Sequence, residues 1–348
     1  MLDDSRCEGI LARKLLFEEV VSLQEEKLIT VITTFYNAAS YLKTWAVSVA
    51  AQTYLNKAQV IVLDDGSTDD SLELMKKYLA QYKIPAEIFT HEKNLGTMQS
   101  QFELYGMIDT KYFTVLDADD YWLTEKKLEK AVDFLEAHED FSIYASNYAL
   151  EYKDGRVVPT LSRNAPSGAF PSLKNGISPQ TSSTVFRNFF TPDLLNKIDA
   201  ASKKYHDDSF RGDSFRNLLA YKFGKLYFEN SMDSVYRCDI GIVWGLLTEI
   251  EQDLINSKSY SEMFEFYKDT FGIDDNANEV LNYFVQFYIK SIQNFFQMIK
   301  DGRILNFECK YYFKKSIGQN AAQANGSTII FNTLLEQCKR FNELGLKL

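Results

Sequence analysis

Three carboxylates gather in the segment VLDADDYW at residues 115–122, directly after an apolar run. Asp117, Asp119 and Asp120 should repel one another, because two like charges about 4 Å apart cost on the order of 4 kcal/mol at an effective dielectric constant of about 20. That cost is large beside a typical domain stability of about 5–15 kcal/mol. A divalent cation held by the carboxylates would relieve it, whereas solvation at the start of the next helix, with Asp120 as its cap, is the simpler alternative.

A second acidic segment, LDDGS at residues 63–67, also follows an apolar run. Alone it indicates little, because Asp-Gly is a common turn and Ser67 could cap the following helix. In an open parallel sheet, however, ligands bind beyond the carboxyl ends of the strands. Two acidic strand ends on one edge of a sheet therefore predict a negatively charged site that is suited to a cation.

The elements that would position these residues are short β-branched runs that alternate with longer amphipathic runs. Strands are expected at residues 28–35, 59–67, 86–91 and 111–120, and helices at residues 41–52, 69–82 and 97–108. This βαβ alternation predicts an α/β fold, in which a mostly parallel central sheet is flanked by helices.

Outside this region the pattern changes. The dipeptide Asp154-Gly155 predicts a hairpin between two strands within residues 141–161, and the proline-containing stretch 162–179 is expected to be a loop. Three regions follow: an N-terminal amphipathic helix within residues 1–27, a central domain at residues 28–245 with halves 28–120 and 121–245, and a helical C-terminal region at residues 246–348.

The composition limits the partners and the compartment. A net charge of −10 argues against nucleic acid, whose phosphates are bound by clustered Lys and Arg. The four cysteines are scattered without a CxxC pair, so neither a zinc site nor a disulfide framework is indicated. Without a signal peptide or an apolar stretch of about 18 residues, we expect a cytoplasmic protein, attached at most peripherally to the cytosolic face of the inner membrane. The sequence leaves homo-oligomerisation open.

The motifs together resemble family-2 inverting glycosyltransferases of the GT-A fold. The matching segments are ITVITTFYNAASYL, VIVLDDGSTDDSLE, NLG at residues 94–96, VLDADDYW, GDSFRNLLAYKFGKLYF and SVYRCDIGIVW. The resemblance spans residues 28–245 and implies a Rossmann-like central sheet. The helical remainder of the chain carries no matching motif.

The resemblance implies a metal-assisted donor site. Asp117 and Asp119 would hold Mn²⁺ or Mg²⁺ against the diphosphate of a nucleotide-sugar, with Asp119 as the more direct ligand and Ala118 beside the donor. Both cations prefer oxygen ligands. Many relatives have a histidine two positions after the arginine of a YRxH motif, where this chain has Asp239. This aspartate would be a further oxygen ligand of the metal, unless the segment is only structural.

The resemblance also implies a nucleoside pocket at the first two strand ends. Asp64 and Asp65 would meet the base or ribose, and Thr33, Phe35 and Tyr36 would line the pocket.

A transferase of this kind needs a base for the acceptor hydroxyl. In the resembling family this group is a carboxylate that precedes a helix in the second half of the domain, which is Asp213 here. Asp207 and Asp208 are rival candidates, and Asp213 as a simple helix cap is the structural alternative.

The expected function is therefore metal-dependent transfer of a sugar, with inversion, from a UDP-sugar or similar donor. The acceptor would be a saccharide or lipid-linked saccharide in bacterial surface glycan assembly. A nucleotidyltransferase that makes a nucleotide-sugar, or a non-catalytic scaffold that binds one, remain the alternatives.

Overall fold

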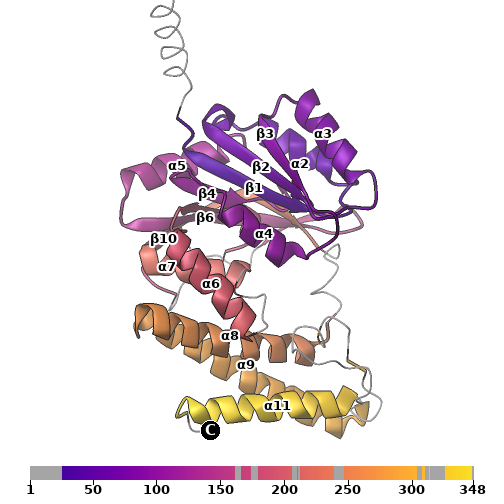
Figure 1. Cartoon of the computed structure of the whole chain (residues 1–348), viewed down its shortest axis with the longest axis vertical. Coiled ribbons are helices and arrows are strands. Elements are labelled where there is room, and N and C mark those ends of the chain that lie inside the picture. The colour runs from indigo at the N-terminus through magenta and orange to yellow at the C-terminus, as the bar shows by residue number, and fades with distance from the viewer. Residues whose placement is uncertain are drawn as a thin grey trace, which may run out of the picture.

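A ten-stranded sheet forms the centre of the computed structural model (Figure 1). The structure describes residues 26–160, 166–173, 179–205, 210, 212–238, 247–303, 308–309, 313 and 326–346. The strand order is β3-β2-β1-β4-β9-β6-β10-β5, with β7 paired to β6 and β8 paired to β10. The expected N-terminal helix lies almost wholly outside the described residues.

The first half of the sheet is parallel, as the sequence predicts. Its strands are β1 (Ile29–Phe35), β2 (Ala58–Asp64), β3 (Ala86–Thr90) and β4 (Tyr112–Val115), connected by helices α2 (Leu42–Ala50), α3 (Ser71–Gln81) and α4 (Thr97–Tyr105). The fourth strand ends at Val115 and not at residue 120, because the chain turns where the Asp120 amide donates to the Asp117 carbonyl at 3.0 Å. The acidic residues therefore form a loop beyond the strand.

The second half of the sheet is mixed, within the mostly parallel α/β fold that the sequence predicts. Only β6 and β10 pair in parallel here, and the other pairings are antiparallel. The elements are β5 (Tyr121–Trp122), α5 (Lys127–Ala137), β6 (Phe141–Glu151), β7 (Val157–Pro159), β8 (Gly168–Phe170), η3 (Thr181–Ser183), β9 (Thr184–Arg187), α6 (Pro192–Tyr205), α7 (Asp213–Phe223) and β10 (Lys225–Arg237).

The two sequence predictions for this half meet different outcomes. The hairpin at Asp154-Gly155 is confirmed, because β6 and β7 pair antiparallel across it. The expected loop at residues 162–179 is partly wrong, because Gly168–Phe170 forms β8 and pairs with β10. No local sequence signal specifies this long-range pairing.

The core lies on both faces of the sheet. Helices α2, α3 and α5 pack on one face, and α4, α6 and α7 on the other. The C-terminal helices are α8 (Glu249–Phe271), α9 (Asp275–Lys300) and α11 (Gly326–Glu343). Phe264 and Phe266 of α8 belong to the same buried cluster as Phe113 of β4, so α8 extends the core of the sheet. The division of the chain near residue 245 stays a prediction.

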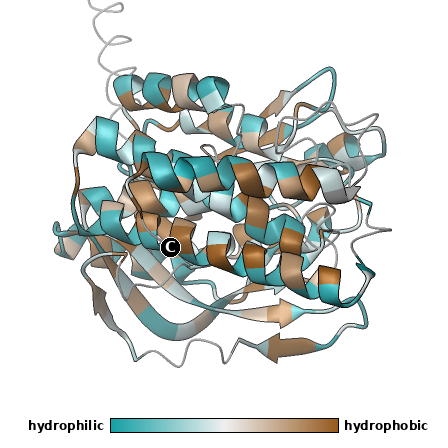
Figure 2. Cartoon of the chain, turned by 90° about the horizontal axis from the view of Figure 1, so that it is seen from below, coloured by the Kyte–Doolittle hydropathy of each residue, from teal (hydrophilic) through white to brown (hydrophobic). Residues whose placement is uncertain are grey.

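Figure 2 views the molecule from below, the side of the C-terminal helices. Hydrophobic and hydrophilic residues alternate along these helices in that view. No helix among the described residues is long and apolar enough to span a membrane.

We expect Gly66→Ala to destabilise the protein far more than Gly155→Ala. Both glycines have positive φ, +72° and +82°, which costs an alanine about 1–2 kcal/mol. Only at Gly66 would a Cβ also meet backbone, at 2.6 Å from the Lys93 carbonyl carbon. In urea unfolding, the free energy of unfolding should fall by about 3 kcal/mol or more for Gly66→Ala and by about 1 kcal/mol for Gly155→Ala. Equal losses would show that this close approach is unimportant.

Candidate active site

Strands β1, β2 and β4 end at the same edge of the sheet, where the predicted acidic residues lie. Asp64 and Asp65 follow β2 and are 3% and 2% exposed. Asp64 accepts a hydrogen bond from the Ser67 amide at 3.0 Å. Asp65 accepts from the amides of Leu95 and Gly96, each at 2.8 Å. The two carboxylates therefore fix the β2–α3 turn and the loop that leads into α4.

His91 adds a third hydrogen bond to Asp65. Its Nδ1 lies 3.0 Å from Asp65 Oδ1, and its Nε2 lies 2.8 Å from Glu103 Oε2. Burial lowers the pKa of the imidazole, but the hydrogen bonds to both carboxylates outweigh it and raise the pKa above its ordinary value. A carboxylate has about four acceptor positions, so Asp65 keeps about one for a ligand.

The three predicted residues of the first strand end differ in exposure. Thr33 is fully buried, donates to the Leu116 carbonyl at 2.7 Å and accepts from Trp45 Nε1 at 3.1 Å. Phe35 is 4% exposed within the core, whereas Tyr36 is 38% exposed. Of the three, only Tyr36 presents much of its side chain at the surface in this state.

The acidic loop, which we define as residues 117–120, is held by amide groups from distant segments. Asp117 accepts from Gln101 Nε2 of α4 at 3.1 Å. Asp120 is 1% exposed and accepts from Gln180 Nε2 at 2.8 Å and from the Arg237 amide at 3.1 Å. Asp117 and Asp119 are partly buried. Ala118 lies between them and is 4% exposed.

Burial and mutual repulsion make these carboxyl groups weak acids. Burial first, and then the charge of Asp119, raise the pKa of Asp117 to about 7, although Arg216 and Gln101 act against the shift. Burial also raises the pKa of Asp119, against the charge of Arg237. The pKa of Asp120 is well above its ordinary value, because of burial and then the charges of Asp119 and Asp117. The loop therefore stores unfavourable electrostatic energy when it is ionised.

The end of β10 contacts the acidic loop through Arg237. Arg237 donates from Nη1 to the Asp119 carbonyl at 2.6 Å and from Nε to Glu151 Oε2 at 2.8 Å, and it lies over the Tyr121 ring. Burial and then the charge of Asp120 raise the pKa of Tyr236 to about 12. The motif YRCD thus adjoins the acidic loop through its tyrosine and arginine. Asp239 lies outside the described residues.

Asp213 is the first residue of α7 and is exposed. Its Oδ1 accepts from the Ser214 amide at 2.7 Å. The charge of Asp213 contributes to the raised pKa of Asp117, after burial and the charge of Asp119. Asp207 and Asp208 lie outside the described residues.

The comparisons with known proteins agree with this arrangement. Residues 30–190 match the family model described as Glycosyl transferase family 2. This segment belongs to glycosyl transferase family 2. The predicted family resemblance is therefore confirmed, and the segment is a transferase domain.

The sequence relatives match this chain over only part of their own length. An uncharacterised glycosyltransferase of Methanocaldococcus jannaschii is 33% identical over 129 residues, which make up 36% of this chain and 43% of that protein. An uncharacterised protein of Mycobacterium tuberculosis is 25% identical over 126 residues, 36% of either chain. The chain thus spans about a third of the length of the latter relative.

Solved structures show the same fold over more of the chain. TarS residues 1–349 of S. aureus in complex with UDP has a TM-score of 0.56 at 16% identity, and covers 81% of this chain and 75% of that chain. The same TarS fragment in complex with UDP-GlcNAc has a TM-score of 0.56 at 17% identity, and the match covers 76% of this chain and 73% of that chain. The expected GT-A fold is confirmed.

The acidic loop of the family-2 domain fits a cation that is shared with a phosphate ligand. Within the parts of the chain that the structure describes, no three His, Cys, Asp or Glu side chains are grouped to hold a metal by themselves. Mg²⁺, however, is usually bound by one or two carboxylates together with substrate phosphates and waters. Asp117 and Asp119 supply such oxygen donors, and a nearby cation would favour the ionised form of both carboxyl groups, whose pKa values burial raises.

Several residues of the site carry no signal that identifies them in the sequence. Gln101, Gln180 and Arg216 belong to three segments far apart in the chain, and each reaches the acidic loop or its supports. Arg237 is identifiable in the sequence only as part of the YRCD motif. The acidic loop is recognisable because its three carboxylates stand close together in the sequence.

We expect Asp119→Asn to stabilise the metal-free protein at pH 8. Because the folded-state pKa of Asp117 is raised to about 7, the folded protein keeps a proton that the unfolded chain releases, and stability falls as the pH rises toward 7. Removing the neighbouring charge should reduce that fall by about 1 kcal/mol. Urea unfolding in EDTA at pH 5.5 and pH 8 measures the fall in the free energy of unfolding for the parent protein and the variant.

The matched control for this substitution is Asp109→Asn, which neutralises an exposed carboxylate just before β4. It should change the pH dependence little. If Asp119→Asn fell in stability as steeply as the parent protein, repulsion within the acidic loop would be refuted.

Proposed function

We propose that this protein is a metal-dependent inverting glycosyltransferase. It would move a sugar from a nucleotide diphosphate donor, in the first place a UDP-sugar, to a hydroxyl of a saccharide or lipid-linked saccharide. The observation that carries the proposal is the buried acidic loop, whose Asp117 has a pKa raised to about 7, on the same sheet edge as Asp64 and Asp65. The TarS structures, which contain UDP and UDP-GlcNAc, support the choice of donor.

Asp117 and Asp119 would hold Mn²⁺ or Mg²⁺, with Asp239 as a further candidate ligand. When bound, the metal supplies Lewis-acid stabilisation of the charge that grows on the leaving diphosphate. Asp64 and Asp65 would bind the base or ribose through their remaining acceptor positions, and Tyr36 has an exposed ring that can flank the nucleoside. Thr33 and Phe35 would support this pocket from the core.

Asp213 would act as the general base. It would accept the proton of the acceptor hydroxyl while that oxygen forms a bond to the anomeric carbon from the face opposite the diphosphate. The bond from the anomeric carbon to the diphosphate oxygen breaks in the same step, so the configuration inverts. Its exposed position at the start of α7 leaves the carboxylate open to an acceptor. We place this reaction in bacterial surface glycan assembly, in the cytoplasm or at the cytosolic face of the inner membrane.

A panel of nucleotide-sugars, each incubated with the full chain in Mn²⁺ or in EDTA, tests the proposed reaction. We expect Mn²⁺-dependent release of UDP from one UDP-sugar. Pyrophosphate release would indicate a nucleotidyltransferase instead, and nucleotide binding without any release would indicate a scaffold.

Asp119→Asn should weaken Mn²⁺-dependent UDP binding by at least about 100-fold, because it removes the more direct metal ligand. Isothermal titration calorimetry in Mn²⁺ and in EDTA measures this loss, with Asp109→Asn as the control. Unchanged affinity in Mn²⁺ would contradict the assignment of the metal site.

Asp213→Asn should retain UDP affinity within about twofold and reduce the single-turnover transfer rate by about 10²–10⁴-fold, as expected for a lost general base. The matched control is Asp193→Asn, which removes an exposed carboxylate from the first turn of α6. Near-normal transfer by Asp213→Asn would move the base to Asp207 or Asp208.

A further inference from the structure

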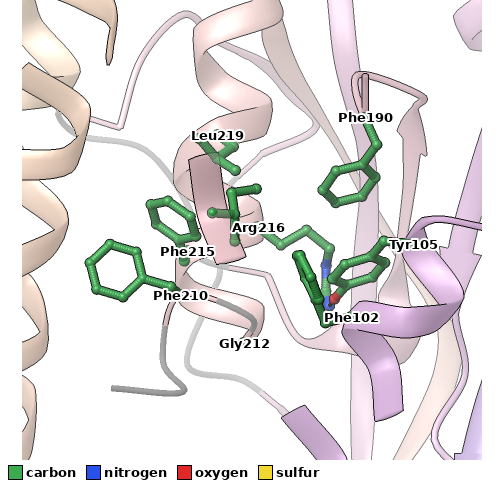
Figure 3. Close-up of a pocket in the computed structure, with 9 residues that line it drawn as sticks. Phe102, Tyr105, Phe190, Phe210, Gly212, Phe215, Arg216 and Leu219 are labelled. Carbon is green, nitrogen blue, oxygen red and sulfur yellow. Dashed lines mark hydrogen bonds between the residues drawn. The ribbon is translucent and has the colours of Figure 1, made fainter. Parts of the chain in front are cut away.

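Arg216 is a buried charge one helical turn after Asp213. Its side chain is 2% exposed and extends from α7 toward Tyr105, beside the rings of Phe102 and Phe190 (Figure 3). Nη1 donates to the Tyr105 hydroxyl at 2.8 Å. Nη2 donates at 3.4 Å to the hydroxyl of Thr181, the first residue of η3. Arg216 Nε is buried and has no hydrogen-bond partner.

The first of these contacts leads to the acidic loop through α4. The Tyr105 hydroxyl donates to Gln101 Oε1 at 3.5 Å, and Gln101 Nε2 donates to Asp117 Oδ1 at 3.1 Å. Tyr105 and Gln101 are 3% and 5% exposed, so water does not compete for these contacts. Arg216 is therefore connected to Asp117 by three successive hydrogen bonds.

The second contact leads to the other end of the acidic loop. Thr181 follows Gln180, whose Nε2 donates to Asp120 Oδ2 at 2.8 Å. The Gln180 side chain is oriented by the Ser182 hydroxyl, which donates to its Oε1 at 2.5 Å. One guanidinium thus joins α7 to two of the segments that hold the acidic loop, α4 and the segment of Gln180 and Thr181.

An arginine at this place has a cost that needs an explanation. Taking a charge out of water costs several kcal/mol unless it is fully compensated, and Arg216 leaves one donor unpaired. Burial lowers the pKa of Arg216, but Tyr105 and then the charges of Asp213 and Asp117 raise it above its ordinary value, so the side chain stays charged. The rigid fork of a guanidinium can serve two acceptors in fixed directions, which a lysine cannot.

We propose that Arg216 is a positioning residue that fixes the start of α7, and with it Asp213, relative to the acidic loop. This inference rests on the proposed function. Asp213 needs such a support because it lies in an exposed first turn, where, within the described part of the chain, its carboxylate is bonded by the adjacent Ser214. A displacement of about 1 Å between reacting groups can cost about 10²-fold in rate.

A double-mutant cycle between Arg216→Met and Asp213→Asn tests the proposal. We expect Arg216→Met to reduce the single-turnover transfer rate by about 10–100-fold, with UDP affinity and donor KM changed less than about threefold. In the Asp213→Asn background the same substitution should cause no further fall, because it acts only through Asp213. An equal fall in both backgrounds, or a matching loss of UDP affinity, would overturn the proposal.

Two further variants keep the test decisive if Arg216→Met does not fold. Tyr105→Phe removes a single buried hydroxyl from the first hydrogen-bond path and should show the same pattern with a loss of about 3–10-fold. Arg187→Met is the matched control, because within the described part of the chain this arginine bonds the carbonyls of Phe141, Leu135 and His138 and the Tyr112 hydroxyl, and none of residues 117–120. It should leave the transfer rate unchanged below its unfolding temperature.

A parent protein that transfers no sugar from any donor would reject the proposed function instead.

Discussion

Electrostatic repulsion within the acidic loop is the constraint on which the site depends. Asp117, Asp119 and Asp120 are placed at the end of a buried strand, where burial and neighbouring charge raise their pKa values. A loop of this kind would rearrange if it were held only by its own residues. Instead, donors from other segments hold it: the amide groups of Gln101 and Gln180 and the backbone N–H of Arg237 bond the Asp117 and Asp120 carboxyl groups, and the Arg237 guanidinium bonds the Asp119 carbonyl. These donors orient the carboxyl groups, and a bound cation would offset the repulsion that is left among them.

The three donors come from α4, from the segment before η3 and from the end of β10, so the site is assembled from both halves of the sheet. Hydrophobic packing places these segments, because α4 and α7 share one buried cluster with β4 and with α8. Arg216 of α7 connects two of these segments, because it bonds Tyr105 of α4 and Thr181 beside Gln180. The packing sets the approximate position of each element, and the hydrogen bonds fix the directions of the side chains.

The sequence was informative where a signal is local. The βαβ periodicity gave the four parallel strands, and the spacing of Asp64, Asp65 and Asp117 gave the acidic edge of the sheet. Long-range pairing has no such signal, which is why strand β8 and the antiparallel pairing of β9 with β6 are not predicted from the sequence. The role of Arg216 was also missed, since a DxxR spacing on a helix does not reveal that the arginine is buried.

Strand β10 lies beyond residue 190, where the match to glycosyl transferase family 2 ends, yet it sits inside the sheet between β6 and β5. A fragment that stopped at residue 190 would leave β6 with an open row of backbone donors and acceptors, a surface that recruits strands from other chains and leads to aggregation. Residues 30–190, which match the family model, therefore do not contain the whole sheet. Any transplant of this domain into another protein has to carry Lys225–Arg237 with it.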